Sequence, residues 1–237
     1  MKNTMSLAIA ASTAARCHDK VGPRQSQLCI GFDDMQGSDT QESSRRIVDA
    51  IDQGRAREYA LLATLLSHSP DSRSLSRLAG LRGDASPIGR AHTTLGDAAR
   101  RVNEEIVAQE YFALFAGLGQ GQLLPYSSHY LTGSLYGRPL AQIRESLQTL
   151  GIEKASECSE PEDHAAMLCE VMAGLVGGNI AAPAGADRNF FEQHLLPWIG
   201  RFFVELERAE AAVFYRCVGS LGRAFIDIEA QAFALPD

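Results

Sequence analysis

The spacing of large apolar residues toward the C-terminus constrains the fold more than any other feature of the chain. These residues recur every three or four positions, as they do on the buried face of an α-helix. In residues 190–203 they are Phe190, Phe191, Leu195, Trp198, Ile199, Phe202 and Phe203, and in residues 213–228 they are Val213, Phe214, Cys217, Val218, Leu221, Phe225 and Ile228. The same period occurs over residues 47–66, 75–82, 88–116 and 140–150, and no stretch alternates as a half-buried strand does. We therefore expect an all-α fold.

The composition of the chain changes near residue 43. Residues 1–43 mix Gly, Ser, Asp and Gln without a sustained period, which is typical of a poorly ordered tail. Residues 44–237 carry the helical pattern, and 45% of the whole chain is hydrophobic, which is enough for a substantial core. We expect an N-terminal tail, residues 1–43, followed by a single helical domain, residues 44–237, built as one body or as two helical lobes.

Charge and cysteine usage exclude several classes of protein. The net charge of −7 argues against a nucleic-acid partner, which requires clustered Lys and Arg. The five cysteines are odd in number, widely spaced and without a CxxC pair, which indicates reduced thiols rather than a disulfide framework. No apolar run reaches the ~18 residues of a membrane span, and the apolar patch after Lys2 is too interrupted for a strong secretory signal. We expect a cytoplasmic protein without stable membrane insertion.

Residues 157–175, ECSEPEDHAAMLCEVMAGL, place acidic residues, a proline and a histidine before a helical pattern. Ser159 and Glu162 fit the capping box S-x-x-E, with Pro161 in the first helical turn, where its missing N–H costs nothing. This interpretation makes the segment a helix start. It does not explain Asp163 and His164, so a binding surface stays open as an alternative.

Two other interpretations of this region involve chemistry. Cys158, His164 and Cys169 lack a fourth ligand at a recognisable spacing, so we expect no metal site. Asp163 beside His164 suits an acid/base pair, but no nucleophile motif such as GxSxG occurs, so we expect no catalytic residues. The loop GLGQGQ, residues 117–122, lacks the Gly-Lys-Ser/Thr ending of a phosphate-binding loop.

An ordered series of short motifs resembles the TorD/DmsD family of redox-enzyme maturation chaperones, which is grouped with NarJ-like proteins. The motifs are EYFALFAGLGQGQLLPYSSHYLTGSLYG, LGI, EPEDH and FFEQHLLPWIGRFFVELERA, spread over about residues 47–235. The resemblance implies an all-helical protein that is not an enzyme. It also implies binding to the twin-arginine signal peptide, the apoprotein or both, of a molybdenum or tungsten oxidoreductase, and assistance with cofactor insertion before Tat export.

The resemblance further implies a signal-peptide-binding surface. Its residues in this chain are Tyr111, Leu114, Phe115, Pro125, Tyr126, Gly137, Glu160, Pro161, Asp163 and His164. Guanidinium groups pair well with carboxylates such as those of Glu160 and Asp163. Two departures from the family pattern bear on which signal peptide is preferred. The segment AGLGQGQ stands where Gly-Pro often follows the Leu-Phe segment, and the aromatic cluster is reduced to PYSSHY.

The client and the ligands stay open. Formate dehydrogenase and reductases of the trimethylamine-oxide or dimethyl-sulfoxide type are the client classes that we expect. We expect no resident cofactor, while a transient contact with molybdopterin or a guanine nucleotide is left open, as is the choice between monomer and homodimer. The rival functions are an all-α metal- or acid/base-dependent enzyme that uses Asp163 and His164, and a scaffold that binds folded subunits only.

Overall fold

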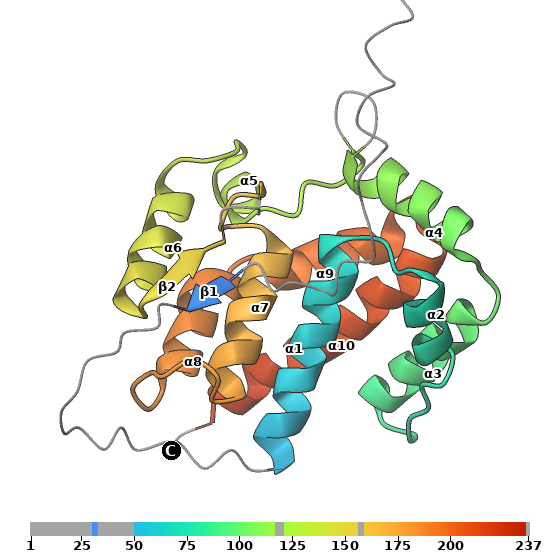
Figure 1. Ribbon diagram of the computed structural model, residues 1–237, viewed down its shortest axis with the longest axis horizontal. Helices are drawn as coiled ribbons and strands as arrows, with labels where there is room; N and C mark the ends of the chain where they lie inside the picture. The colour runs from blue at the N-terminus through green and yellow to red at the C-terminus, as the bar shows by residue number, and fades with distance from the viewer. Residues whose placement is uncertain (1–29, 33–49, 117–120, 156–158, 236–237) are drawn as a thin grey trace, which may run out of the picture.

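The computed structural model describes residues 30–32, 50–116, 121–155 and 159–235, and these residues are mostly helical (Figure 1). The α-helices are α1 (Ala50–Ser67), α2 (Ser72–Leu78), α3 (Pro87–Ala99), α4 (Glu104–Tyr111), α5 (Ser127–Thr132), α6 (Arg138–Thr149), α7 (Ala165–Val176), α8 (Ala186–Phe190), α9 (Ile199–Arg208) and α10 (Phe214–Phe233). Two π-helical turns, η1 (Phe112–Ala116) and η2 (Phe191–Leu195), directly follow α4 and α8. The predicted all-α class is confirmed.

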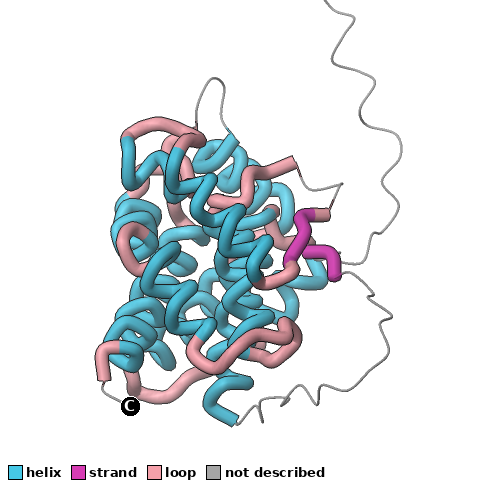
Figure 2. The backbone as a smooth tube through the Cα atoms, turned by 90° about the vertical axis from the view of Figure 1, so that its left-hand side faces the viewer, coloured by secondary structure: helices cyan, strands magenta, loops and turns pink. Residues whose placement is uncertain are grey.

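Two short strands lie at one edge of the helical body (Figure 2). Strand β1 (Ile30–Phe32) pairs antiparallel with β2 (Ile152–Lys154), with Ile30 opposite Lys154. Strand β1 is the described part of the predicted tail, and the rest of residues 1–43 lies outside the described residues. The predicted division of the chain near residue 43 therefore stays a prediction.

The core lies where the longest helices pack together. Helix α1 packs against α7, and α10 packs against α9 and α3. Figure 1 shows α6 at one end of the molecule and α2, α3 and α4 at the other. The largest fully buried side chains are aromatic, namely Trp198, Tyr59, Tyr215, Phe191, Phe202, Phe203 and Phe214. Most of them come from the two C-terminal stretches whose spacing predicted helices.

Two predicted helices are interrupted. The predicted helix 88–116 stops at the end of α3, and Asn103 starts α4 by accepting a hydrogen bond from the backbone N–H of Ile106 at 2.9 Å. The predicted helix 190–203 is divided between η2 and α9 around Pro197, whose ring leaves no backbone N–H to continue the ladder. Polar caps and prolines override apolar periodicity at both places.

The sequence predicts a loop over the whole of GLGQGQLLPYSSHY, residues 117–130, and this prediction is partly wrong. Residues 117–120 lie outside the described residues, but Ser127–Thr132 form α5. The helix ends at Gly133, whose φ of +76° is the left-handed conformation that glycine adopts at low cost. Only one and a half turns long, α5 is too short to show apolar periodicity in the sequence.

Two buried carboxylates fix α10 in place. Glu110 accepts hydrogen bonds of 2.7–3.0 Å from three successive backbone N–H groups, those of residues 213–215, and so caps the start of α10. Glu229 near its other end accepts from Nε and Nη2 of Arg55 at 2.7 and 2.8 Å and from the hydroxyl of Tyr59 at 2.9 Å. These contacts tie α10 to α4 and α1.

Candidate functional site

Two segments far apart in the sequence meet where α7 begins. The backbone N–H of Ser127 donates to the carbonyl oxygen of Asp163 at 3.0 Å, and that of Ala165 donates to the carbonyl oxygen of Pro125 at 2.8 Å. Tyr126 and His164, the middle residues of the two segments, form an antiparallel bridge. The fold thereby joins Pro125 and Tyr126 to residues 160–164, which we call the acidic turn.

The predicted capping box at Ser159 and Glu162 is wrong, because α7 begins only at Ala165. The backbone N–H of His164 donates to the carbonyl oxygen of Pro161 at 3.1 Å, and the residues that follow pair with the segment 125–127, so this single turn does not continue into α7. The carboxylate of Glu162 instead lies 2.9 Å from Nη2 of Arg144 on α6. The acidic turn is therefore a separate hydrogen-bonded turn that joins other elements, not the first turn of α7.

His164 caps α7. Its Nδ1 accepts a hydrogen bond from the backbone N–H of Ala166 at 3.1 Å. Burial lowers the pKa of His164 to about 4, against the opposing effect of the Glu160 and Asp163 charges. The ring is therefore neutral near pH 7, and it suits general acid/base catalysis poorly, because such a group works best with a pKa near the operating pH.

Asp163 organises the loop beside it. Its side chain is 1% exposed, and Oδ2 accepts from the backbone N–H of Ser128 at 3.0 Å. The hydroxyl oxygen of Ser128 in turn accepts from the backbone N–H of Tyr136 at 3.0 Å. The other carboxylate oxygen, Oδ1, is buried without a hydrogen-bond partner. Asp163 thus fixes Ser128 directly and Tyr136 through Ser128, while its Oδ1 has no hydrogen-bond partner.

Tyr126 and Glu160 form the exposed part of the site. The hydroxyl of Tyr126 donates to Oε2 of Glu160 at 2.5 Å, and Nζ of Lys154 donates to the carbonyl oxygen of Glu160 at 3.1 Å. Burial and then this contact with Glu160 raise the pKa of Tyr126 above its ordinary value of 10. The Tyr126 ring meets the His164 ring edge-on, with centroids 5.1 Å apart. An exposed carboxylate is thus held in place by an aromatic side chain.

These residues line a hollow of about 190 Å³, which we call the acidic hollow. Its lining consists of Tyr126, Leu135, Tyr136, Ser159, Glu160, Pro161 and Asp163. One carboxylate is exposed and the other is buried, and apolar or aromatic side chains stand beside both. This combination suits a cationic group that has apolar neighbours.

Part of the predicted surface lies outside the lining of the acidic hollow. Leu114 is fully buried, so it supports the core. Tyr111 and Phe115 pack against each other and against Tyr215, with ring centroids 5.0–5.7 Å apart. Burial, and then the charge of Glu160, raise the pKa of Tyr111 to about 12. Tyr111 therefore lies within electrostatic reach of the acidic turn.

Leu135 and Tyr136 were missing from the predicted site although both line the acidic hollow. They are 40% and 58% exposed, and Tyr136 has a φ of +70°, which is uncommon for a residue other than glycine. Gly137, which was predicted, follows with a φ of +82° and starts α6. Two large apolar residues in a short turn between Gly133 and Gly137 were the available sequence signal, because no helical face can bury them there.

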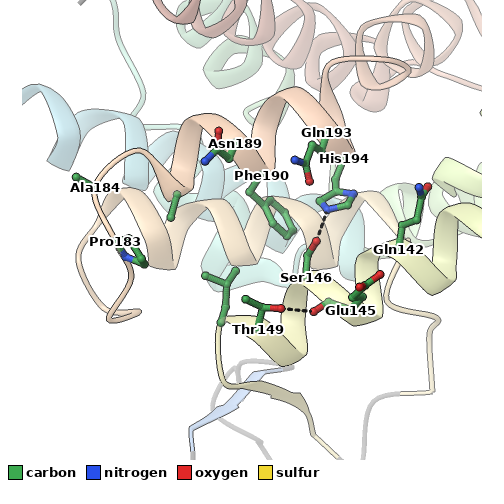
Figure 3. A pocket seen from close by; sticks show the side chains of 12 residues that line it. Gln142, Glu145, Ser146, Thr149, Pro183, Ala184, Asn189, Phe190, Gln193 and His194 are labelled. Carbon is green, nitrogen blue, oxygen red and sulfur yellow. Dashed lines mark hydrogen bonds between the residues drawn. The ribbon is translucent and has the colours of Figure 1, made fainter.

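A larger hollow of about 590 Å³ lies between α6 and the segment formed by α8 and η2 (Figure 3). In its floor Nε2 of His194 lies 2.8 Å from the hydroxyl oxygen of Ser146, and burial lowers the pKa of His194 to about 4. Among the residues that the structure describes, no Lys or Arg lines this hollow, so those residues offer no counter-charge for the phosphate groups of molybdopterin or a guanine nucleotide. A transient contact with either stays a prediction.

The described residues contain neither a metal-binding cluster nor a membrane-spanning helix. No group of three or more His, Cys, Asp or Glu side chains among residues 30–32, 50–116, 121–155 and 159–235 is placed to hold a metal ion. Within the same ranges, no helix is both long enough and apolar enough to span a membrane. Of the metal candidates considered above, Cys158 lies outside the described residues, and Cys169 is a buried free thiol.

Comparison with known proteins defines the class. The family profile described as nitrate reductase delta subunit matches residues 82–204, more than half of the chain. The chain is 30% identical to the chaperone protein TorD of Vibrio cholerae over 70% of this chain and 76% of that protein, and 26% identical to TorD of Vibrio atlanticus over 78% and 97%. A solved structure from Archaeoglobus fulgidus, described as a candidate redox enzyme maturation protein, is 21% identical with a TM-score of 0.48, over 74% of this chain and 93% of that one.

The family profile and the TorD relatives together place this chain in a family of chaperones rather than of enzymes. The chain belongs to the nitrate reductase delta subunit family, which groups the TorD and NarJ-like chaperones. The predicted family membership is confirmed.

Proposed function

We propose that this chain is a cytoplasmic chaperone that binds the twin-arginine signal peptide, and the apoprotein, of a molybdenum or tungsten oxidoreductase. It holds the precursor back from Tat export while the cofactor is inserted, so its action is binding rather than turnover. The client is an enzyme of the formate dehydrogenase or the dimethyl-sulfoxide and trimethylamine-oxide reductase type. The acidic hollow carries the proposal, because Glu160 and Asp163 stand there beside aromatic and aliphatic side chains.

Charge and exposed apolar surface support this function. A signal peptide of this kind presents two guanidinium groups followed by an apolar helix. Glu160 offers an exposed carboxylate for the cationic part, and the net charge of −7 favours the approach of a cationic peptide. Leu131, Leu135 and Tyr136 are 40–58% exposed near one another in the chain and suit the apolar part.

The direct test is a binding titration of the full chain with a twin-arginine signal peptide fused to a soluble carrier protein. Glu160→Gln removes the exposed negative charge at the rim of the hollow. Adding Asp163→Asn removes the buried negative charge as well, and the amide oxygen of the asparagine can still accept a hydrogen bond from the backbone N–H of Ser128. We expect at least a threefold weaker affinity for the single variant and a larger loss for the double variant. Asp227→Asn, exposed on α10, makes the same change in net charge and is the matched control.

Three outcomes separate the candidate functions. Loss in the hollow variants with normal binding by the Asp227 variant supports the proposal, and higher salt should weaken the wild-type affinity. Equal affinity in all variants would move the peptide contact away from the acidic hollow. Failure of the wild-type chain to bind any twin-arginine peptide, while it captures folded client subunits from cell extracts, would favour the scaffold function instead.

A further inference from the structure

Three primary amides line the larger hollow between α6 and the segment of α8 and η2. They belong to Gln142 on α6, Asn189 on α8 and Gln193 on η2, and we call this hollow the amide hollow (Figure 3). No described residue lines both it and the acidic hollow. We propose that the amide hollow binds an extended, uncharged segment of the client apoprotein through the main-chain amides of that segment. This inference rests on the proposed function and gives the apoprotein a site separate from that of the signal peptide.

The three amides have the hydrogen-bonding chemistry of a peptide backbone. Each offers donors and an acceptor, which match the N–H and C=O groups that repeat along an extended chain. Within the part of the chain that the structure describes, the side-chain amides of Gln142, Asn189 and Gln193 make no hydrogen bond with another residue. All three residues are exposed, so their amides are accessible to a ligand.

The floor of the amide hollow adds a further polar group and an apolar one. Nε2 of His194 lies 2.8 Å from the hydroxyl oxygen of Ser146, and whichever of the two donates, the hydroxyl can make another hydrogen bond. The ring of Phe190 packs against that of His194, with centroids 4.8 Å apart. Gln193 and His194 both belong to a π-helical turn, a rare conformation that is frequent at functional sites.

The charge of the amide hollow selects among ligands. Burial lowers the pKa of His194 to about 4, so among the described lining residues Glu145 alone is charged near pH 7. A phosphate-bearing ligand pairs best with Arg or Lys, which those residues do not include. A cationic segment finds two carboxylates at the acidic hollow and one here. The amide hollow therefore suits a neutral partner.

The length of the amide hollow suits a short extended segment. Gln142 and Leu150, the first and last lining residues on the α6 side, are about 12 Å apart along the helix at ~1.5 Å per residue. An extended chain rises about 3.3 Å per residue, so roughly four residues cover this length. Because the backbone supplies the contacts, binding should depend little on the side chains of the segment.

The first test needs no identified client. The side-chain amide signals of the isotope-labelled full chain are followed by NMR during titration with an uncharged, acetylated and amidated peptide of Thr and Val residues. We expect the signals of Gln142, Asn189 and Gln193 to shift together, and that of Gln148, exposed on α6 outside the lining, to stay unchanged. A copy of the peptide with every backbone amide N-methylated has no N–H to donate and should bind at least about tenfold more weakly.

The second test separates the amide hollow from the acidic hollow. The triple variant Gln142→Ala, Asn189→Ala and Gln193→Ala removes the three amides, and Gln148→Ala is the matched control on the same helix. We expect the triple variant to bind the Thr-Val peptide at least about tenfold more weakly and the control to bind it normally. Both should bind the twin-arginine fusion with the wild-type affinity. Circular dichroism confirms that each variant is folded.

The remaining outcomes contradict one proposal or the other. Peptide binding that survives N-methylation or the triple substitution would overturn the inference, as would the absence of shifts at millimolar peptide. Shifts of the same three signals with guanosine triphosphate but not with the peptide would overturn it in favour of a nucleotide. Loss of fusion binding in the triple variant would overturn the separation of the two sites. Failure of the wild-type chain to bind the fusion would instead overturn the proposed function.

Discussion

Acid should destabilise this protein through His164, and the structure sets the size of the effect. The ring is buried, and burial lowers its pKa from the ordinary 6.5 to about 4. Between these values the unfolded chain binds a proton that the folded chain does not. The stabilisation is therefore complete above pH 6.5 and is lost as the pH falls toward 4. At about 1.4 kcal/mol for each pH unit, the full window corresponds to roughly 3 kcal/mol.

The variant His164→Asn isolates this contribution. Asparagine is a favourable N-cap, so it can still accept from the backbone N–H of Ala166, and it does not titrate. Urea unfolding followed by circular dichroism gives the free energy of unfolding at several values between about pH 7.5 and 4.5. We expect the wild type to lose roughly 2.5 kcal/mol more than the variant over this range.

Parallel stability curves for the wild type and His164→Asn would refute the argument, because they would mean that the His164 ring gains its proton equally easily in the folded and unfolded chain.

His194→Gln provides an independent comparison. Burial also lowers the pKa of His194 to about 4, so this variant should flatten the same acid limb. Because the His194 ring lines an open hollow, we expect its contribution to the acid-induced loss of unfolding free energy to be smaller than that of His164.

Three further predictions concern the framework, and urea unfolding checks each. Glu110→Ala should cost about 3 kcal/mol, because it leaves three N–H groups of α10 without their acceptor. Arg55→Met should cost about 3–5 kcal/mol by removing the cationic partner of the buried Glu229 carboxylate, and adding Glu229→Gln should recover part of this loss. Gly121→Ala would place a Cβ 2.5 Å from a backbone oxygen and should cost roughly 1–3 kcal/mol, whereas Gly54→Ala has open space and should be neutral or stabilising by up to about 1 kcal/mol.

The sequence by itself determined the fold class, because a helix encodes its buried face within its own residues. The predicted helices 47–66 and 140–150 correspond to α1 and α6 to within a few residues. Where prediction failed, a single residue competed with the periodic pattern, as Asn103 and Pro197 did. The acidic turn was recognisable as well, since its residue types stand next to each other in the chain.

Only the tertiary structure decided how the acidic turn is arranged. Its backbone pairs with residues 125–127, a partner that no local pattern specifies, and this pairing moves the start of α7 to Ala165. The same contact buries Asp163 while Glu160 stays exposed, although both are carboxylates of one short segment. It also brings Tyr136 to the hollow. Long-range contacts set burial, and burial decides which polar side chains of a turn support the fold and which can meet a ligand.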